Sequence, residues 1–531
     1  MSTLSELNFD NRYTADLPGD PSDENTSRFV ANAAYSRVQP KRASKPQLLA
    51  WSDEVLDLLD LERNVIERPE FLEVFSGNQQ LDGMDPHAMR YGGHQFGHWA
   101  DQLGDGRAIV LGEVQTKKAG RQTLQLKGAG PTPYSRRADG LAVLRSSVRE
   151  FLCSEAMHHL GVPTTRALSL VTTGDEVMRD MFYDGHPELE PGAIVCRVAP
   201  SFVRFGSFEI AAAHGERDLL ERLFDHVCEL HFPHLEGTRA EKTAALFAEV
   251  VRSTCEMVVE WQRVGFVHGV MNTDNLSIHG VTIDYGPYGW LEDYNPGWTP
   301  NTTDRTHHRY AFGNQPGVAN WNLAKLGSAL APLLDGSEVG IEPLQAAVDG
   351  YAETFQIRYQ AMLATKFGLR EVEAEDAKLF DRAFELIGAV ETDMTIWFRL
   401  LSEISADSEP GEDDLLILSE AGYRAEEWEA SHRESMVAWL SDYKARLRRE
   451  NSIDAERRDA MNRANPIYVL RNYLAQLAID DAAKGDFARL REQLDVLRRP
   501  YAVQPGRGQY AEKRPDWARS RPGCSQLSCS S

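Results

Sequence analysis

Residues 268–275, His-Gly-Val-Met-Asn-Thr-Asp-Asn, and residues 282–286, Thr-Ile-Asp-Tyr-Gly, decide the fold of this chain. The first stretch places Asn275 seven positions after a histidine and directly after the carboxylate of Asp274. The second brings another carboxylate, Asp284, in front of a Tyr-Gly pair. Carboxylate and amide oxygens suit a hard cation such as Mg²⁺, so Asn275 and Asp284 are the candidate metal ligands.

The spacing is that of a protein-kinase catalytic loop and metal-binding turn with one residue changed. In the kinase pattern His-x-Asp-x-x-x-x-Asn, the catalytic Asp follows the His by two positions and the metal-binding Asn follows it by seven. His268 and Asn275 keep this spacing, but the position of the base is Val270, which cannot accept a proton. The nearest carboxylate is Asp274. The pattern predicts a kinase-like nucleotide site with a reaction other than ordinary phosphorylation.

A short glycine-containing loop precedes two predicted strands, 108–114 and 122–127. It contains Gly104, Gly106 and Arg107. Glycines let the backbone approach phosphates closely, and arginine adds a fixed charge. Taken alone, the loop is better explained as a hairpin turn, because it lacks the full G-x-G-x-x-G pattern.

Two charged residues favour the nucleotide interpretation of this loop. Lys127 ends the second predicted strand, and Glu150 lies 23 residues on, inside a helix predicted at 141–160. Kinases pair a strand lysine with a helix glutamate to hold the phosphates of the nucleotide. Either residue alone would more often be a surface charge. The order of loop, lysine, glutamate and the two motifs above is hard to obtain by chance.

Four further residues are candidates for the same site. Asp139 and Gly140 close a loop directly before the predicted helix, where they also suit an N-cap turn. Arg197 and Arg204 flank the junction between the strand-rich and helical parts of the chain. Arginine side chains from these two positions can converge on a polyphosphate.

Hydrophobic periodicity predicts a small β-rich N-lobe followed by a large α-helical C-lobe. Together with the two motifs, this order indicates an α+β, protein-kinase-like bilobal fold. Further strands are predicted at 167–171 and 193–198, and long helices at 218–230, 240–264 and 321–334. The expected organisation is an N-terminal extension at 1–90, a nucleotide-binding N-lobe at 91–205, a helical C-lobe with the catalytic loop and metal site at 206–500, and a mobile tail with Cys529 at 501–531.

Composition limits the partners of this chain. The 531 residues carry a net charge of −23, which disfavours nucleic acid and anionic membranes as partners. The sequence contains no apolar run of about 18 residues, so no membrane-spanning helix is predicted. Because the N-terminus has neither a signal-peptide nor a transit-peptide pattern, a cytoplasmic location is expected.

Histidines and cysteines give no metal-binding pattern. His94 and His98 lie among glycines that disfavour a regular helix, so structural roles are expected for both. Four of the six cysteines lie in predicted helices or strands and are expected to be buried and reduced. Cys524 and Cys529 lie in the polar C-terminal tail.

Several motifs in the same order resemble the selenoprotein O (YdiU) family of protein adenylyltransferases over nearly the whole chain. They are Phe-Asp-Asn-Arg-Tyr at 9–13, Tyr-Gly-Gly-His-Gln-Phe-Gly at 91–97, Gln-Leu-Lys-Gly-Ala-Gly at 125–130, the stretch at 268–275, Asp-Tyr-Gly-Pro at 284–287, Asn-Gln-Pro at 314–316 and Asn-Pro at 465–466.

The resemblance implies a pseudokinase that transfers AMP from ATP to Ser, Thr or Tyr hydroxyls of proteins and releases pyrophosphate. ATP is then bound inverted relative to kinases, with Mg²⁺ (or Mn²⁺) as cofactor. It further implies Asp274 as proton acceptor, Asn275 and Asp284 as metal ligands, and Glu150 as the partner of Lys127. The implied nucleotide-binding residues are Gly104, Gly106, Arg107, Lys127, Asp139, Gly140, Arg197, Arg204 and Asp284.

The chain departs from the family in its cysteines. Members often carry selenocysteine or cysteine near the C-terminus, as at Cys529, and in some this residue pairs with a cysteine near the activation loop. No cysteine lies between Cys255 and Cys524 here.

Two other functions stay open at this point. A kinase with Asp274 as its base would release ADP, and a non-catalytic ATP-binding scaffold would bind ATP without turnover.

Overall fold

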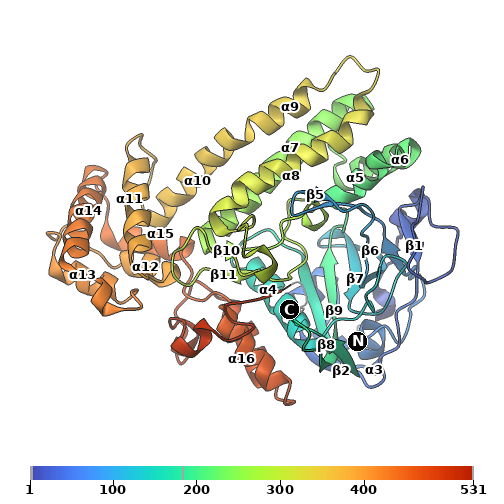
Figure 1. Cartoon of the computed structure of the whole chain (residues 1–531), viewed down its shortest axis with the longest axis horizontal. Helices are drawn as coiled ribbons and strands as arrows, with labels where there is room; N and C mark the ends of the chain where they lie inside the picture. The colour runs from blue at the N-terminus through green and yellow to red at the C-terminus, as the bar shows by residue number, and fades with distance from the viewer. Residues whose placement is uncertain (1–3, 182–183, 529–531) are drawn as a thin grey trace.

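The computed structural model describes residues 4–181 and 184–528 and contains a β-rich lobe and a helical lobe (Figure 1). The β-rich lobe is built on a seven-stranded sheet with the order β1-β3-β6-β7-β9-β8-β2. All its neighbouring strands are antiparallel. The α+β bilobal fold predicted from the sequence is therefore confirmed. The strands of the sheet are β1 (Tyr35–Arg37), β2 (Gln47–Trp51), β3 (His87–Met89), β6 (Ala108–Thr116), β7 (Gly120–Lys127), β8 (Arg166–Arg179) and β9 (Glu188–Ala199).

The centre of the sheet carries the predicted strands. β6 and β7 form the expected hairpin, and β9 pairs with β7 so that Arg197 lies opposite Gln125. Leu124 and Leu126 alternate with these polar residues and are fully buried in a hydrophobic cluster on one face. This alternation along β7 turns Gln125 and Lys127 to the opposite face, where the interlobe cleft lies.

The predicted N-terminal extension, residues 1–90, is part of the β-rich lobe itself over its described residues, 4–90. They supply β1, β2 and β3. They also supply α2 (Asp53–Leu58) and α3 (Pro69–Phe75), which share a hydrophobic cluster with the sheet through Val55 and Phe71. The three strands have only 3, 5 and 3 residues, too few to show a hydrophobic periodicity.

Helix α4 (Leu144–His159) contacts β8 and β9 on the cleft side of the sheet. It begins three residues later than predicted, because Leu141 and Val143 form β-bridges with Ala129 and Gly192. Residues 144–157 include many that are buried, and Glu150 is one of them. The helix therefore places the carboxylate of Glu150 against the cleft-side face of the sheet.

The helical lobe contains α7 (Arg239–Val264), which has a capping box at Thr238 and is followed by Gly265 in the left-handed conformation (φ 75°). The helices predicted at 218–230 and 240–264 are confirmed as α6 and α7. The third helix, α8, begins earlier than predicted, at Gln315. The remaining α-helices are α1 (Arg12–Asp16), α5 (Phe205–Ala213), α6 (Arg217–His231), α7 (Arg239–Val264), α8 (Gln315–Leu330), α9 (Glu342–Asp349), α10 (Tyr351–Phe367), α11 (Asp376–Ala389), α12 (Met394–Leu401), α13 (Glu412–Ser419), α14 (Ala430–Arg449), α15 (Asp454–Ala464), α16 (Asn472–Ala482) and α17 (Ala488–Leu497).

Four short strands form two further ladders. β4 (His94–Gln95) pairs with β5 (His98–Trp99), and β10 (Phe266–Val267) pairs with β11 (Gly289–Trp290). The catalytic-loop motif follows β10 directly. Within the described part of the chain, no helix is long and apolar enough to cross a membrane.

The C-terminal segment is packed along residues 501–528, in contrast to the mobile tail expected from its composition. Tyr510 and Cys524 are buried in a small cluster with Tyr468. Farther on, Leu527 forms a β-bridge with Asn301. Isolated apolar residues anchor this segment without any periodic pattern, so its packing could not be predicted from hydrophobic periodicity. Cys529 lies outside the described residues.

The buried state predicted for four cysteines is confirmed. Each is a free, buried thiol: Cys153, Cys196, Cys228 and Cys255.

Candidate active site

A cavity of about 640 Å³ lies between the two lobes and contains nearly all of the predicted site. Glu150 is the exception, since it stands behind Lys127. Eleven predicted residues line the cavity: Gly104, Gly106, Arg107, Lys127, Asp139, Gly140, Arg197, Arg204, Asp274, Asn275 and Asp284.

Lys127 and Glu150 form an ion pair with 2.6 Å between Nζ and a carboxylate oxygen. Both side chains are buried, and Nζ also lies 3.3 Å from Asp284. Burial lowers the pKa of Lys127, and the two carboxylates oppose this effect. The pair fixes the lysine at the rear of the cavity, which is how a kinase-like site holds its phosphate-binding lysine.

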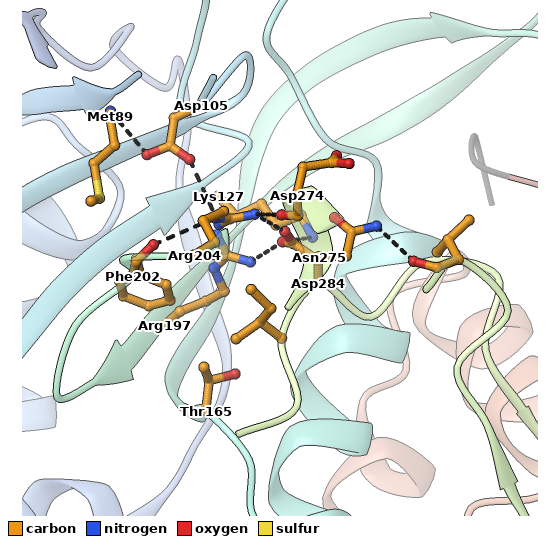
Figure 2. A network of polar contacts seen from close by, with 12 residues as sticks. Met89, Asp105, Lys127, Thr165, Arg197, Phe202, Arg204, Asp274, Asn275 and Asp284 are labelled. Atoms are coloured by element: carbon orange, nitrogen blue, oxygen red, sulfur yellow. Dashed lines mark hydrogen bonds and ion pairs between the residues drawn. The ribbon is translucent and has the colours of Figure 1, made fainter. Parts of the chain in front are cut away.

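Asp284 is the point on which three cationic side chains converge (Figure 2). Arg197 and Arg204 each donate a hydrogen bond to its carboxylate, and Lys127 approaches from β7. Burial alone would raise the pKa of Asp284, but these charges hold that pKa well below its usual range. Its backbone has a φ of 59°, a left-handed conformation. Asp284 is therefore ionised throughout the neutral pH range.

The two arginines reach Asp284 from different elements. Arg197 lies on β9 and also bonds Glu150 at 3.1 Å. Arg204 immediately precedes α5, and its guanidinium lies 4.4 Å from the centre of the Tyr91 ring. Both arginines are almost completely buried. With these contacts their guanidinium groups are held in place before any ligand arrives.

Asp274 lies in a short 3₁₀ turn, Thr273–Asn275, and only 6% of it is exposed. Its Oδ2 accepts a hydrogen bond from Nε2 of Gln95 at 3.2 Å. Its Oδ1 is buried without a hydrogen-bond partner, although the residue lines the cavity. Burial raises the pKa of Asp274 to about 7. A carboxylate with a free oxygen and a near-neutral pKa is suited to accept a proton.

Asn275 has an orientation that fits a metal ligand. Its Nδ2 donates to the carbonyl of Val270 at 2.9 Å. Figure 2 shows this nitrogen turned away from Asp284, which leaves the amide oxygen on the side of that carboxylate. An amide oxygen beside an ionised carboxylate forms the oxygen donor set that Mg²⁺ prefers, with phosphate oxygens completing its coordination. The residues present therefore fit the metal that the motif implies.

The glycine loop and the Asp139 turn form the outer part of the cavity. Gly104 has a φ of 76°, and a Cβ there would lie 2.4 Å from the ring of Tyr134. Asp139 caps the following turn by accepting from the backbone of Leu141 at 3.0 Å. Its carboxylate is also paired with Arg179 at 2.7 Å. Asp139 thus has a structural role at the rim of the cavity.

Three neighbours of the site were not predicted as site residues. Gln95 contacts Asp274, and Asp105 lies 3.8 Å from Arg204 and accepts from Gln125 at 3.0 Å. Gly93 lies against Asp274, since a Cβ at Gly93 would be 2.8 Å from Oδ1 and 2.9 Å from Cβ of that residue. The adjacent glycines in the stretch 91–97 were the available signal for this close contact.

The histidines of this stretch differ in their surroundings. His94 is held by Glu209, with 2.7 Å between Nδ1 and a carboxylate oxygen. His98 is exposed and lies 4 positions further along the chain. The hairpin that contains both residues is thus tied to α5 at one end.

Replacement of Gly93 by Ala is expected to lower kcat by about 10²-fold, because the added methyl group must displace the catalytic-loop carboxylate. The KM for ATP is expected to change little. Steady-state kinetics check this result, with Gly411→Ala as the matched control, since a Cβ at Gly411 meets nothing within 4 Å. A folded Gly93→Ala protein with the kcat of the unchanged chain would contradict the importance of the Asp274 position.

Sequence comparison shows relatives over the whole chain. A family profile described as "Protein adenylyltransferase SelO" matches residues 24–498. A protein from Rhodopirellula baltica, named "Protein nucleotidyltransferase YdiU", is 55% identical over 99% of both chains. A protein of the same name from Azoarcus sp. is 56% identical over 99% of this chain and 100% of its own length.

One solved structure, the Toxoplasma gondii protein ROP2, is also similar. It is titled a virulence factor with a protein-kinase fold and no enzymatic activity. The match covers 59% of this chain and 96% of ROP2, with 12% identity and a TM-score of 0.23. With a TM-score this low, the match carries no argument about the site.

Proposed function

The chain belongs to the protein adenylyltransferase SelO family and is therefore a protein nucleotidyltransferase, and on this premise we propose that it transfers AMP from ATP to Ser, Thr or Tyr hydroxyls of proteins. In the proposed reaction, the acceptor oxygen attacks the α-phosphorus and a new P–O bond forms. The bond between the α-phosphorus and the bridging oxygen breaks, and pyrophosphate leaves with its electron pair.

The observation that carries this proposal is the unpartnered Oδ1 of Asp274. Val270 occupies the usual position of a kinase base and offers no proton acceptor. Asp274 supplies a carboxylate in the same cavity, and Gln95 orients it. The proton of the acceptor hydroxyl would pass to Oδ1 as the hydroxyl oxygen attacks.

The cationic side chains suit a pyrophosphate leaving group. Lys127, Arg197 and Arg204 gather on one side of the cavity and are fixed there by ion pairs. We infer that ATP binds with its β- and γ-phosphates toward these charges and its α-phosphorus toward Asp274, inverted relative to a kinase. Preorganised positive charge stabilises the negative charge that develops on the leaving group.

Asn275 and Asp284 are the proposed ligands of Mg²⁺, or of Mn²⁺. The bound metal ion would supply charge neutralisation at the phosphates. Asp284 also positions Arg197 and Arg204, so its carboxylate would serve the cation and the guanidinium groups together.

Incubation of the purified protein and a protein acceptor with Mg²⁺ and ATP, labelled separately at the α- and γ-phosphates, tests the proposal. Label from the α position is expected on the protein, with release of pyrophosphate. Label from the γ position with release of ADP would establish the kinase alternative. ATP binding with transfer from neither position, across several acceptor proteins, would support the scaffold alternative. Reactions with EDTA in place of Mg²⁺ provide the control.

A further inference from the structure

A second cavity of about 610 Å³ lies on the other side of the β4–β5 hairpin from the nucleotide cavity. Gln95 of this hairpin lines the first cavity, whereas its neighbour Phe96 lines the second. Two consecutive residues of the chain thus line different cavities. The residues of its lining that matter here are Phe96, His98, Asp304, His307, Arg309 and Trp321.

The wall between the cavities is firmly bonded to the catalytic loop. The backbone N–H of Phe96 donates to the side chain of Asn272 at 3.2 Å and to the hydroxyl of Tyr310 at 2.9 Å. On the other side of this wall, Gln95 bonds Asp274. A polypeptide bound in the second cavity would therefore pass close to Asp274, the proposed base.

Arg309 provides an unpaired charge in this cavity. Its guanidinium carbon lies 4.7 Å from the centre of the Trp321 ring and 5.8 Å from that of Tyr310. Its Nε is buried without a hydrogen-bond partner. No carboxylate of residues 4–181 or 184–528 lies within the 4.0 Å of an ion pair. Arginine held by aromatic rings in this way keeps donors available for a carboxylate ligand.

A second cation, Lys325, contacts the same Trp321 ring as Arg309, and two imidazole rings line the cavity. His98 and His307 are exposed at the same cavity, and Nζ of Lys325 lies 4.8 Å from the centre of the Trp321 ring. The one carboxylate of the lining, Asp304, accepts from the backbone N–H groups of residues 309 and 310. Both carboxylate oxygens of Asp304 therefore already accept hydrogen bonds from the backbone of its own loop.

Charge complementarity indicates the occupant. The chain has a net charge of −23, so most of its surface repels an acidic polypeptide. The second cavity combines an unpaired guanidinium with aromatic walls, which suits a carboxylate on a short apolar stem. Its position beside Asp274 suits a residue close in sequence to the acceptor hydroxyl.

We propose that this second cavity is the docking site for the acceptor polypeptide, and that it binds an Asp or Glu side chain a few residues from the hydroxyl that is modified. The proposal rests on the proposed function, since it assumes a polypeptide acceptor. Arg309 binds the carboxylate, and Phe96 and Trp321 form the apolar walls. Preference for acidic sequences around the hydroxyl follows from this arrangement.

Two synthetic peptides of about a dozen residues test the proposal, one with Glu around a central Ser and one with Gln in the same places. With ATP labelled at the α-phosphate, the KM of the acidic peptide is expected to be about tenfold lower than that of the neutral peptide. Arg309→Gln is expected to remove this difference and to leave the KM for ATP within about twofold. Arg309→Lys should retain part of it. Arg305→Gln, an exposed neighbour outside the lining, is the matched control.

Direct binding of the fluorescein-labelled peptides, followed by anisotropy, makes the test independent of chemistry. Tighter binding of the acidic peptide that is lost in a folded Arg309→Gln protein supports docking even without transfer. Equal binding and equal KM values for the two peptides overturn the docking proposal, as does an acidic preference that survives in Arg309→Gln. If AMP transfer persists in those cases, the proposed function stands. Absence of transfer with intact peptide preference would count against the proposed function alone.

Discussion

Asp284→Asn is expected to lower metal-dependent AMP transfer by about 10³-fold or more. The neutral amide binds a divalent cation more weakly than a carboxylate does, and it no longer balances the charges of Arg197, Arg204 and Lys127. Binding of ATP in the presence of Mg²⁺ should weaken together with turnover. Calorimetric titration with and without Mg²⁺, alongside kinetics, measures both effects.

Folding must be checked in the same variant. Loss of one partner from a buried ion-pair network costs roughly 3–5 kcal/mol, so the melting temperature should fall. Glu190→Gln is the matched control, because it removes a carboxylate that pairs with Arg145 at 2.6 Å outside the cavity lining. A folded Asp284→Asn protein with unchanged Mg²⁺-dependent activity would contradict the metal-site assignment.

Asp274→Asn is expected to lower kcat by roughly 10²–10⁴-fold while the affinity for ATP and Mg²⁺ stays nearly unchanged. Asparagine has a similar size and shape, but it cannot take the proton of the acceptor hydroxyl. Single-turnover kinetics with α-labelled ATP isolate the chemical step, and calorimetry measures nucleotide binding. Full kcat in this variant would show that another group, or none, accepts the proton.

The pH profile gives an independent check of the same role. The pKa of Asp274 is raised to about 7 by burial, and the proposed role as base requires its ionised form. The value of kcat/KM should therefore rise with pH and level off above a midpoint near 7. In Asp274→Asn this limb should be absent. A midpoint that persists in the variant would have to belong to a different group.

Local patterns in the sequence were enough to predict the core of the fold. The apolar run of β6, the alternation along β7 and the helical periodicity of α7 are each visible over a short stretch of sequence. The pair of Lys127 and Glu150 was also predictable, since one ends a strand and the other lies in the helix that packs behind it. Motif spacing predicts that Asp274, Asn275 and Asp284 belong to one site, and all three line the same cavity.

Contacts between distant segments were not predictable in the same way. Gln95 and Asp274 are 179 positions apart, and their hydrogen bond depends on how the β4–β5 hairpin folds over the catalytic loop. Arg197 and Arg204 were expected at a polyphosphate, and in the structure they also form the ion pairs that hold Asp284. The strands before residue 90 have only 3 to 5 residues each, too few for a periodic pattern, so only the completed sheet identifies them.

The burial of Asp274 also has a consequence for conformational stability. The carboxyl group has a pKa of about 7 in the folded protein, whereas its ordinary value is 3.8. Between these two pH values the folded protein retains a proton that the unfolded chain releases, so the free energy of unfolding falls as pH rises. The full loss, present above pH 7, is at most roughly 4 kcal/mol. The enzyme is thus least stable, as far as this group is concerned, under the conditions in which its base is ready to act.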